Sequence, residues 1–175
     1  MGVVVWINGP FSAGKTTVAE LLARDSAVHV LDPEILGVML RDHVVPASLY
    51  PGDFQDLALW RAFTRDAVSE VAARHHGPVV VPMTVARRDY FAEIVDAIRA
   101  RQPLYHFTLM ASRSEILRRE QMRPDETGGW SAKTIDRVLP ELADPRYAEH
   151  IDAERLGPHE IADLIRSRVE VSDRG

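Results

Sequence analysis

Apolar residues recur along the chain in two alternating patterns. Short β-rich apolar runs alternate with longer segments whose apolar residues lie three or four positions apart, the spacing of a helix with one buried face. The predicted strands are Val3–Ile7, Val28–Leu31, Val79–Val81, Leu104–Met110 and a weaker one near His150–Asp152. The predicted helices are Lys15–Arg24, Pro33–Leu40, Asp53–His75, Arg88–Arg101, Ser112–Met122, Trp130–Leu142 and Pro158–Val169. Such alternation predicts an α/β fold in which helices cover both faces of a parallel sheet.

The pattern shows no internal repeat and no break in composition. We therefore expect residues 1–175 to form a single domain, which at this length can bury a sizeable core. The segment Pro124–Gly129 is polar and rich in glycine, proline and acidic residues, so it predicts a mobile loop. We place this loop inside a lid that spans about residues 118–135.

Composition narrows the classes of function. A net charge of −5 argues against nucleic-acid binding through bulk electrostatics, and the absence of cysteine excludes disulfides, thiolate nucleophiles and cysteine-ligated metals. No spacing among the seven histidines resembles a zinc site. No signal peptide or apolar run of transmembrane length is visible, so the expected compartment is the cytoplasm. The closing amphipathic helix could touch a membrane surface, although covering the sheet is its expected role.

The first predicted strand runs directly into a loop that contains two glycines. The segment from Gly9 to Thr16 reads GPFSAGKT and satisfies G-x-x-x-x-G-K-[ST] at every fixed position. Backbone N–H groups of such a loop, together with the N-terminus of the following helix, bind phosphate oxygens. Lys15, one of only two lysines, is expected to reach the β- and γ-phosphates in catalysis, and the Thr16 hydroxyl to ligate Mg²⁺. The predicted nucleotide-binding residues of the loop are Gly9, Ser12, Ala13, Gly14, Lys15, Thr16 and Thr17.

The loop motif alone does not define the reaction, because ATPases, GTPases and kinases share it. The Asn-Lys-x-Asp motif, with which a GTPase recognises the base of its nucleotide, is absent. The third strand ends in Pro82-Met83-Thr84 and has no carboxylate where a mechanical ATPase would carry an aspartate. Both observations favour a small-molecule phosphotransferase or a nucleotide-binding protein.

Asp32 is the candidate carboxylate, because it follows the second predicted strand. Open α/β sheets bind ligands beyond the carboxyl ends of their strands, so Asp32 could accept a proton from an attacking hydroxyl or hold a magnesium-bound water. The alternative is that Asp32 begins the helix from Pro33 as an N-cap, and both roles are compatible.

Three arginines lie just before the predicted mobile loop. Arg118, Arg119 and Arg123 could belong to a lid that closes over the phosphates and excludes water. We assign Arg118 to nucleotide binding, and Arg119 and Arg123 to catalysis. The alternative is a solvated helix face on which the arginines pair with Glu115 or Glu120.

Several segments resemble the tunicamycin resistance proteins, which are small P-loop ATP-binding proteins akin to nucleoside and antibiotic kinases. The matching blocks are WINGPFSAGKTT, LDPEILGVML, DFQDLALWRAF, VPMT, HFTLMAS and WSAKTIDR, and the resemblance runs from Val3 to about Ile151. The resemblance implies a P-loop kinase-like three-layer sandwich with five strands in the order 2-3-1-4-5. It also implies ATP, Mg²⁺ and protection against tunicamycin, a uridine-containing nucleoside antibiotic. By position, Asp32 matches the acidic residue that related kinases use near the acceptor, and Arg119 and Arg123 match lid arginines.

The same resemblance places the acceptor between the second strand, the helices that follow it and the end of the third strand. The implied substrate-binding residues are Asp32, Glu34, Asp53, Phe54, Gln55, Trp60, Arg61, Arg65, Met83 and Thr84. Aromatic faces, an amide and carboxylates suit a nucleoside. Trp60 and Met83 are more typical of core packing, while Arg61 and Arg65, one helical turn apart, could form a phosphate clamp or face solvent.

The main hypothesis is a kinase that transfers the γ-phosphoryl group of Mg-ATP to a hydroxyl of a tunicamycin-like nucleoside, with Asp32 as base. A second hypothesis is an ATP-binding protein that sequesters the antibiotic without turnover, which the missing strand-end carboxylate favours. A third is a housekeeping kinase for a nucleoside or small alcohol.

Overall fold

The five predicted strands form one parallel sheet. The computed structural model describes residues 2–122 and 132–172. The strands are β1 (Val4–Asn8), β2 (His29–Val30), β3 (Val79–Pro82), β4 (Leu104–Met110) and β5 (His150–Asp152). Their order across the sheet is β2-β3-β1-β4-β5, and every neighbouring pair is parallel. The predicted P-loop kinase-like sheet order is therefore confirmed.

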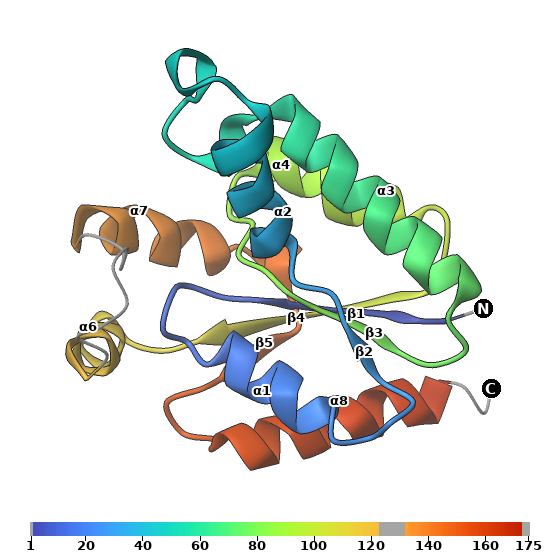
Figure 1. Cartoon of the computed structure of the whole chain (residues 1–175). Helices are drawn as coiled ribbons and strands as arrows, with labels where there is room; N and C mark the ends of the chain where they lie inside the picture. The colour runs from blue at the N-terminus through green and yellow to red at the C-terminus, as the bar shows by residue number, and fades with distance from the viewer. Residues whose placement is uncertain (1, 123–131, 173–175) are drawn as a thin grey trace.

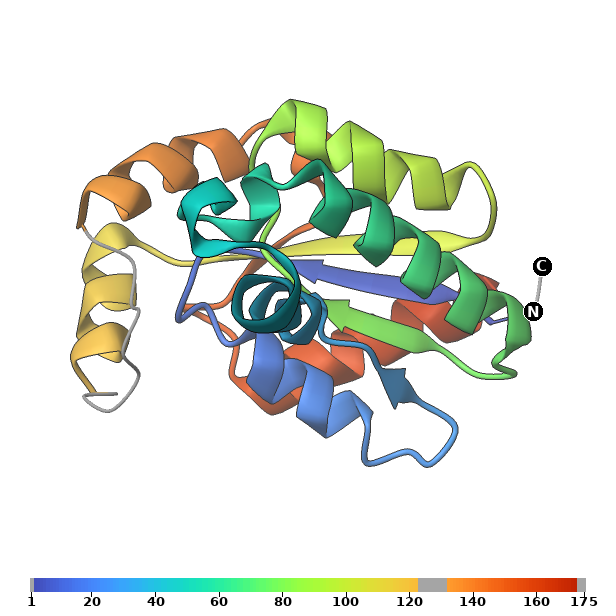
Figure 2. The same ribbon diagram turned by 45° about the horizontal axis from the view of Figure 1, so that its top comes forward.

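Helices cover both faces of this sheet (Figure 1). The α-helices are α1 (Lys15–Leu22), α2 (Pro33–Met39), α3 (Ala58–Arg74), α4 (Arg88–Phe91), α5 (Ala97–Arg99), α6 (Arg113–Gln121), α7 (Ala132–Leu142) and α8 (Pro158–Ser172). A π-helical turn, Ala92–Asp96, joins α4 to α5. One layer holds α1 and α8, and the layer across the sheet holds α2, α3 and α4 (Figure 1). Both α6 and α7 stand at the end of the molecule where the chain leaves β1 (Figure 2).

The alternation of side chains along β1 explains the two layers. Val4 and Trp6 pack into the cluster that α3, α4 and α5 cover, whereas Val5 and Ile7 pack into the cluster that α1 and α8 cover. A strand that is buried on both faces reads as a continuous apolar run, as β1 does. Ile161, Ile165 and Val169 of α8 belong to the second cluster, so this helix covers the sheet. In the described part of the chain no helix combines the length and apolar character needed to cross a bilayer.

The excursion between β2 and β3 departs from the prediction at its turns. A π-helical turn, Leu40–Val44, follows α2, and two 3₁₀ turns, Ala47–Leu49 and Phe54–Asp56, precede α3. The predicted helix from Asp53 begins only at Ala58, because the Asp53 carboxylate accepts a bond from the Gln55 N–H at 2.9 Å and starts a separate turn. Local side-chain bonds of this kind compete with helix formation.

Candidate nucleotide and acceptor site

The loop from Gly9 to Thr16 has the backbone conformation that its glycines allow. Gly9 has φ +138° and Gly14 has φ +97°. A Cβ on Gly9 would lie 2.6 Å from the carbonyl oxygen of Leu109 on β4, so a side chain there is excluded by space as well as by conformation. Gly14 is the N-cap of α1, whose first turn carries no acidic residue. The positive end of α1 therefore faces the loop without a compensating carboxylate.

The Lys15 ammonium lies inside the loop. It donates hydrogen bonds to the carbonyl oxygens of Gly9 (3.0 Å) and Pro10 (2.8 Å). The Ser12 hydroxyl is buried and has no hydrogen-bond partner within the described residues. An unpaired buried hydroxyl beside an ammonium and a helix N-terminus is a set of donors that fits a phosphate.

Side chains at the end of β1 fix the start of the loop against the segment after β3. Asn8 Oδ1 accepts bonds from the N–H groups of Gly9 (2.9 Å) and Val85 (3.0 Å), and Asn8 Nδ2 donates to the Val85 carbonyl at 3.0 Å. The Thr84 hydroxyl donates to the Gly9 carbonyl at 2.6 Å. The polar groups at these two strand ends therefore hold the loop in place.

A cavity of about 520 Å³ opens beside the loop. Its walls come from the phosphate loop and α1, from α6, and from the segment between β5 and α8. The lining residues are Ser12, Ala13, Gly14, Thr17, Val18, Glu115, Arg118, Arg119, Met122, Ala153, Glu154, Leu156, Gly157, Pro158 and Ile161. A volume between 300 and 1,000 Å³ suits a small ligand such as a nucleoside.

The wall from β5 to α8 is absent from the sequence predictions. Its position could have been inferred, since it follows a strand at the carboxyl edge of the sheet, where open α/β folds bind ligands.

Arg118 and Arg119 line this cavity and also pair with Glu115. Arg118 donates to both Glu115 carboxylate oxygens at 2.7 Å, and Arg119 donates to one of them at 2.7 Å. These bonds, first from Arg118 and then from Arg119, lower the pKa of Glu115 to about 2. Arg119 also reaches the carbonyls of Ala13 (3.4 Å) and Ala153 (2.6 Å), so it joins α6 to the loop and to the end of β5. The predicted pairing with Glu115 is therefore confirmed, whereas a role of these arginines in a closing lid stays a prediction. Arg123 lies outside the described residues.

Asp32 follows β2 at the carboxyl edge of the sheet, and β3 separates it from β1. Its Oδ1 accepts the Glu34 N–H at 2.9 Å, and Pro33 occupies the first helical position, so the predicted N-cap role is confirmed. Within the described residues Oδ2 has no hydrogen-bond partner. The catalytic role of Asp32 stays a prediction.

Three of the predicted acceptor residues are buried. Trp60 is fully buried and donates to the Pro33 carbonyl at 3.0 Å, which attaches α3 to the start of α2. Met83 packs in the core, and its carbonyl accepts a bond from Trp6 Nε1 at 3.0 Å. Thr84 is the hydroxyl that holds Gly9. These contacts give the three residues structural roles, and direct contact with an acceptor stays a prediction for them.

Arg61 and Arg65 share a helix face but have different partners. Arg61 donates to Glu93 at 2.7 Å and to the Gln55 carbonyl at 2.7 Å, whereas Arg65 forms a two-point pair with the neighbouring Asp66. Neither arrangement joins the two guanidinium groups into one clamp.

A model of the AAA domain family matches residues 4–144, which is most of the chain. The chain belongs to this AAA domain family. Among solved structures, it is similar to the tunicamycin resistance protein of Deinococcus radiodurans, with 29% identity, a TM-score of 0.81 and coverage of 97% of this chain and 96% of that one. This chain is therefore a P-loop, kinase-like protein related to that resistance protein. No curated protein sequence matches the chain.

More distant structures share the fold of this AAA domain. A gluconokinase from Sinorhizobium meliloti is 21% identical, with a TM-score of 0.65 and coverage of 99% and 94%. A shikimate kinase from Acinetobacter baumannii is 16% identical, with a TM-score of 0.60 and coverage of 97% and 94%. Identities this low establish only that these small-molecule kinases share the architecture.

The described part of this AAA domain contains no group of three or more His, Asp or Glu side chains that could hold a metal ion. Mg²⁺ is commonly held by one or two protein oxygens together with nucleotide phosphates and waters. The hydroxyl of Thr16, at an exposed position in the first turn of α1, and the carboxylate of Asp32 are of the right kind for such a site.

A cluster of polar side chains around Tyr90 was not predicted from the sequence. The Tyr90 hydroxyl donates to Asp56 at 2.6 Å, and the guanidinium groups of Arg61 and Arg87 lie 4.2 and 4.0 Å from the Tyr90 ring centre. Burial, and then the bond to Asp56, raise the pKa of Tyr90. The bond between Tyr90 and Asp56 joins the 3₁₀ turn before α3 to α4. Because Asp56 and Tyr90 are 34 positions apart, no local motif in the sequence reveals it.

Proposed function

We propose that this protein is a phosphotransferase that moves the γ-phosphoryl group of ATP to a hydroxyl of a uridine-containing nucleoside antibiotic of the tunicamycin type. The observation that carries the proposal is the position of Asp32 at the same edge of the sheet as the phosphate loop, with Oδ2 unpaired within the described residues. The similarity to the D. radiodurans tunicamycin resistance protein supports the choice of acceptor.

In the proposed reaction Asp32 accepts the proton of the attacking hydroxyl. The acceptor oxygen forms a bond to the γ-phosphorus, the bond between that phosphorus and the bridging oxygen breaks, and ADP leaves. Lys15 and the N-terminus of α1 stabilise negative charge on the phosphates, and Arg118 and Arg119 flank the adjoining cavity. Thr16 would hold Mg²⁺, which when bound neutralises phosphate charge, and Asp32 would help to hold it through a magnesium-bound water if it does not act as the base. Glu34, Asp53, Phe54 and Gln55, from the excursion after β2, are proposed to surround the acceptor.

Mass spectrometry tests this reaction. After incubation with ATP, Mg²⁺ and tunicamycin, the drug should gain the mass of one phosphate, and Asp32→Asn should abolish this gain. Asp25→Asn is the matched control, because Asp25 also accepts a backbone bond from the residue two positions on, at 2.9 Å, yet lies before β2, at the opposite end of that strand. Recovery of only intact drug from the wild-type protein would refute the proposal.

One observation favours a second function, in which the protein binds ATP and sequesters the antibiotic unchanged. Thr84 stands after β3 where a carboxylate would assist Mg²⁺, and its hydroxyl is committed to Gly9. Stoichiometric binding of drug without product would support this function. Protection of cells at far less than one protein per drug molecule would exclude it.

A further inference from the structure

Asn8, the residue that precedes the phosphate loop, is fully buried, and its side-chain amide has a neighbour for each of its hydrogen-bonding positions. Its Oδ1 accepts the N–H groups of Gly9 and Val85, and one hydrogen of Nδ2 is donated to the Val85 carbonyl. The second hydrogen of Nδ2 is left for Nε2 of His106, at 3.3 Å. The amide can hold the start of the loop in one orientation only, and His106 is the partner that its remaining hydrogen requires.

The backbone carbonyl of Ala148 fixes which nitrogen of His106 can accept a hydrogen bond. Nδ1 lies 3.1 Å from this carbonyl, which can only accept, so Nδ1 carries the proton. In the neutral ring Nε2 is then unprotonated and free to accept the hydrogen of Asn8. Burial lowers the pKa of His106 to about 4, so the ring is neutral at neutral pH.

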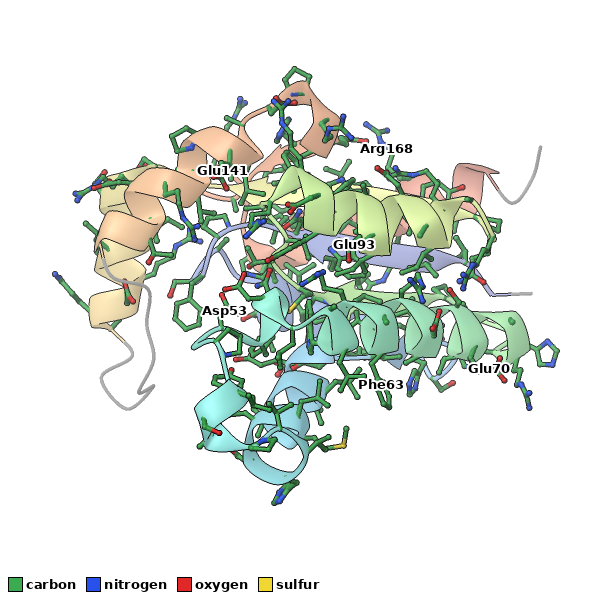
Figure 3. The ribbon with its side chains drawn as sticks, turned by 90° about the horizontal axis from the view of Figure 1, so that it is seen from above. Asp53, Phe63, Glu70, Glu93, Glu141 and Arg168 are labelled. Atoms are coloured by element: carbon green, nitrogen blue, oxygen red, sulfur yellow. The ribbon has the colours of Figure 1, made fainter. Side chains whose placement is uncertain are left out.

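Aromatic side chains on one side of the sheet hold the His106 ring in place. Its centre lies 5.0 Å from that of Phe91 and 6.5 Å from that of Tyr147. Phe91 belongs to α4, and Tyr147 to the turn after α7. The π-helical turn with Glu93 and the end of α7 with Glu141 lie over this same side of the sheet (Figure 3). His106 is therefore only 6% exposed, and other residues line the cavity beside the loop.

We propose that His106 is a positioning residue for nucleotide binding, which fixes the Asn8 amide in the orientation that holds Gly9 at the start of the phosphate loop. Without an acceptor at the place of Nε2, one hydrogen of a buried amide would be unpaired, and Asn8 would turn or shift. Either movement releases the Gly9 N–H and loosens the loop whose backbone is expected to bind phosphate. This inference rests on the nucleotide-binding part of the proposed function and not on phosphoryl transfer.

Packing and positioning require different things of the side chain at residue 106. Packing against Phe91 and Tyr147 requires only a ring, whereas positioning of Asn8 requires an acceptor at the place of Nε2. His106→Phe keeps a ring without the acceptor. His106→Gln loses the ring but can present its Oε1 to the Asn8 amide. The two variants therefore separate the two roles.

Calorimetric titration with ATP and Mg²⁺ tests the inference. His106→Phe should weaken ATP binding by about three- to tenfold, the range for one neutral hydrogen bond, and His106→Gln should bind nearly as tightly as the wild type. Added to Asn8→Ala, the His106→Phe change should have no further effect, because His106 acts through Asn8. His150→Phe is the matched control, since His150 lies on the adjacent strand β5 and its Nε2 bonds to the Leu142 carbonyl at 2.7 Å.

Nitrogen-15 NMR of the wild type gives a second measurement, which needs no variant and so decides the state of the ring even if His106→Phe does not fold. At pH 7 the His106 signals should show an unprotonated Nε2 and a protonated Nδ1. The Gly9 amide signal should move in His106→Phe and stay near its wild-type position in His106→Gln.

Three results would overturn the inference: a protonated Nε2 in the wild type, wild-type ATP affinity in His106→Phe, or equal losses of affinity in the phenylalanine and glutamine variants. If ATP binding follows the expected order but tunicamycin is recovered without phosphate, the proposed function fails and the role of His106 stands.

Discussion

The side-chain amide of Asn8 lies 3.3 Å from Nε2 of His106. Because Asn8 Oδ1 accepts bonds from two backbone N–H groups, its Nδ2 faces the ring and donates. His106 Nε2 must then accept, so the imidazole proton resides on Nδ1 and is donated to the Ala148 carbonyl at 3.1 Å. A neutral histidine thus connects the start of the phosphate loop to the segment before β5.

This arrangement predicts a dependence of stability on pH. Burial lowers the pKa of His106 from 6.5 to about 4. Between these two pH values the unfolded chain binds more protons than the folded one. The contribution of His106 to the free energy of unfolding should therefore be fully present above pH 6.5 and decrease as the pH drops toward 4. The upper limit of the loss is about 3 kcal/mol, from 1.36 kcal/mol per pKa unit.

Urea unfolding of the wild type and of His106→Gln between pH 4 and 8 measures this contribution. The difference between the two proteins isolates His106 from other titrating groups. Parallel pH profiles would show that the histidine is not held neutral in the folded state.

The two loop glycines should differ in their sensitivity to substitution. Gly14→Ala places a Cβ in open space and carries mainly the conformational cost of a positive φ, about 1 to 2 kcal/mol. Gly9→Ala adds a collision with the Leu109 carbonyl, so it should lower the free energy of unfolding further. Thermal unfolding of the two variants gives their order, and equal losses would contradict the close approach of Gly9 to β4.

Lys15→Ala should weaken ATP binding by roughly ten- to a hundredfold, the range for a hydrogen bond to a charged group. The fold should survive, because the Lys15 side chain is only partly buried. Calorimetric titration with ATP checks the affinity, and circular dichroism checks the fold. Arg74→Ala is a suitable control, since Arg74 is an exposed cation at the far end of α3. Unchanged affinity in Lys15→Ala would remove the assigned role of the ammonium.

Trp60→Phe should lower the free energy of unfolding by about 0.5 to 1.5 kcal/mol, because it removes the side-chain bond to the Pro33 carbonyl. Trp6→Phe removes the equivalent bond to the Met83 carbonyl and should cost a similar amount. Of the two tryptophans, only Trp60 bonds to α2, the helix that Asp32 caps, so only its variant should also raise KM for the acceptor. Equal effects of both variants on KM would indicate that Trp60 acts through general stability.

The elements of this fold follow closely from the sequence, because burial on two faces gives strands such as β1 and β3 an unbroken apolar pattern. The phosphate loop is equally predictable, since its chemistry lies in eight consecutive residues. Helix starts are less so. The spacing of the apolar residues does not indicate that the Asp53 side chain separates a 3₁₀ turn from α3.

Contacts between distant segments account for what the sequence could not predict at the site. Asn8 is 77 positions from Val85, and neither residue belongs to a recognisable motif. Arg61 and Arg65 share a helix face, yet the partners that separate them, Glu93 and Asp66, lie in different elements. Pattern analysis identifies residues that can meet, and tertiary packing decides which of them do.

The path of the chain through the sheet has an evolutionary consequence. Between the edge strand β2 and its neighbour β3 the chain makes one uninterrupted excursion, which contains Asp32, while the cavity beside the phosphate loop is built from segments on either side of that excursion. In the proposed reaction, donor and recipient would therefore be held by separable stretches of the gene. Exchange of a single stretch, residues 32–74, could redirect the same phosphate-binding machinery to a new recipient.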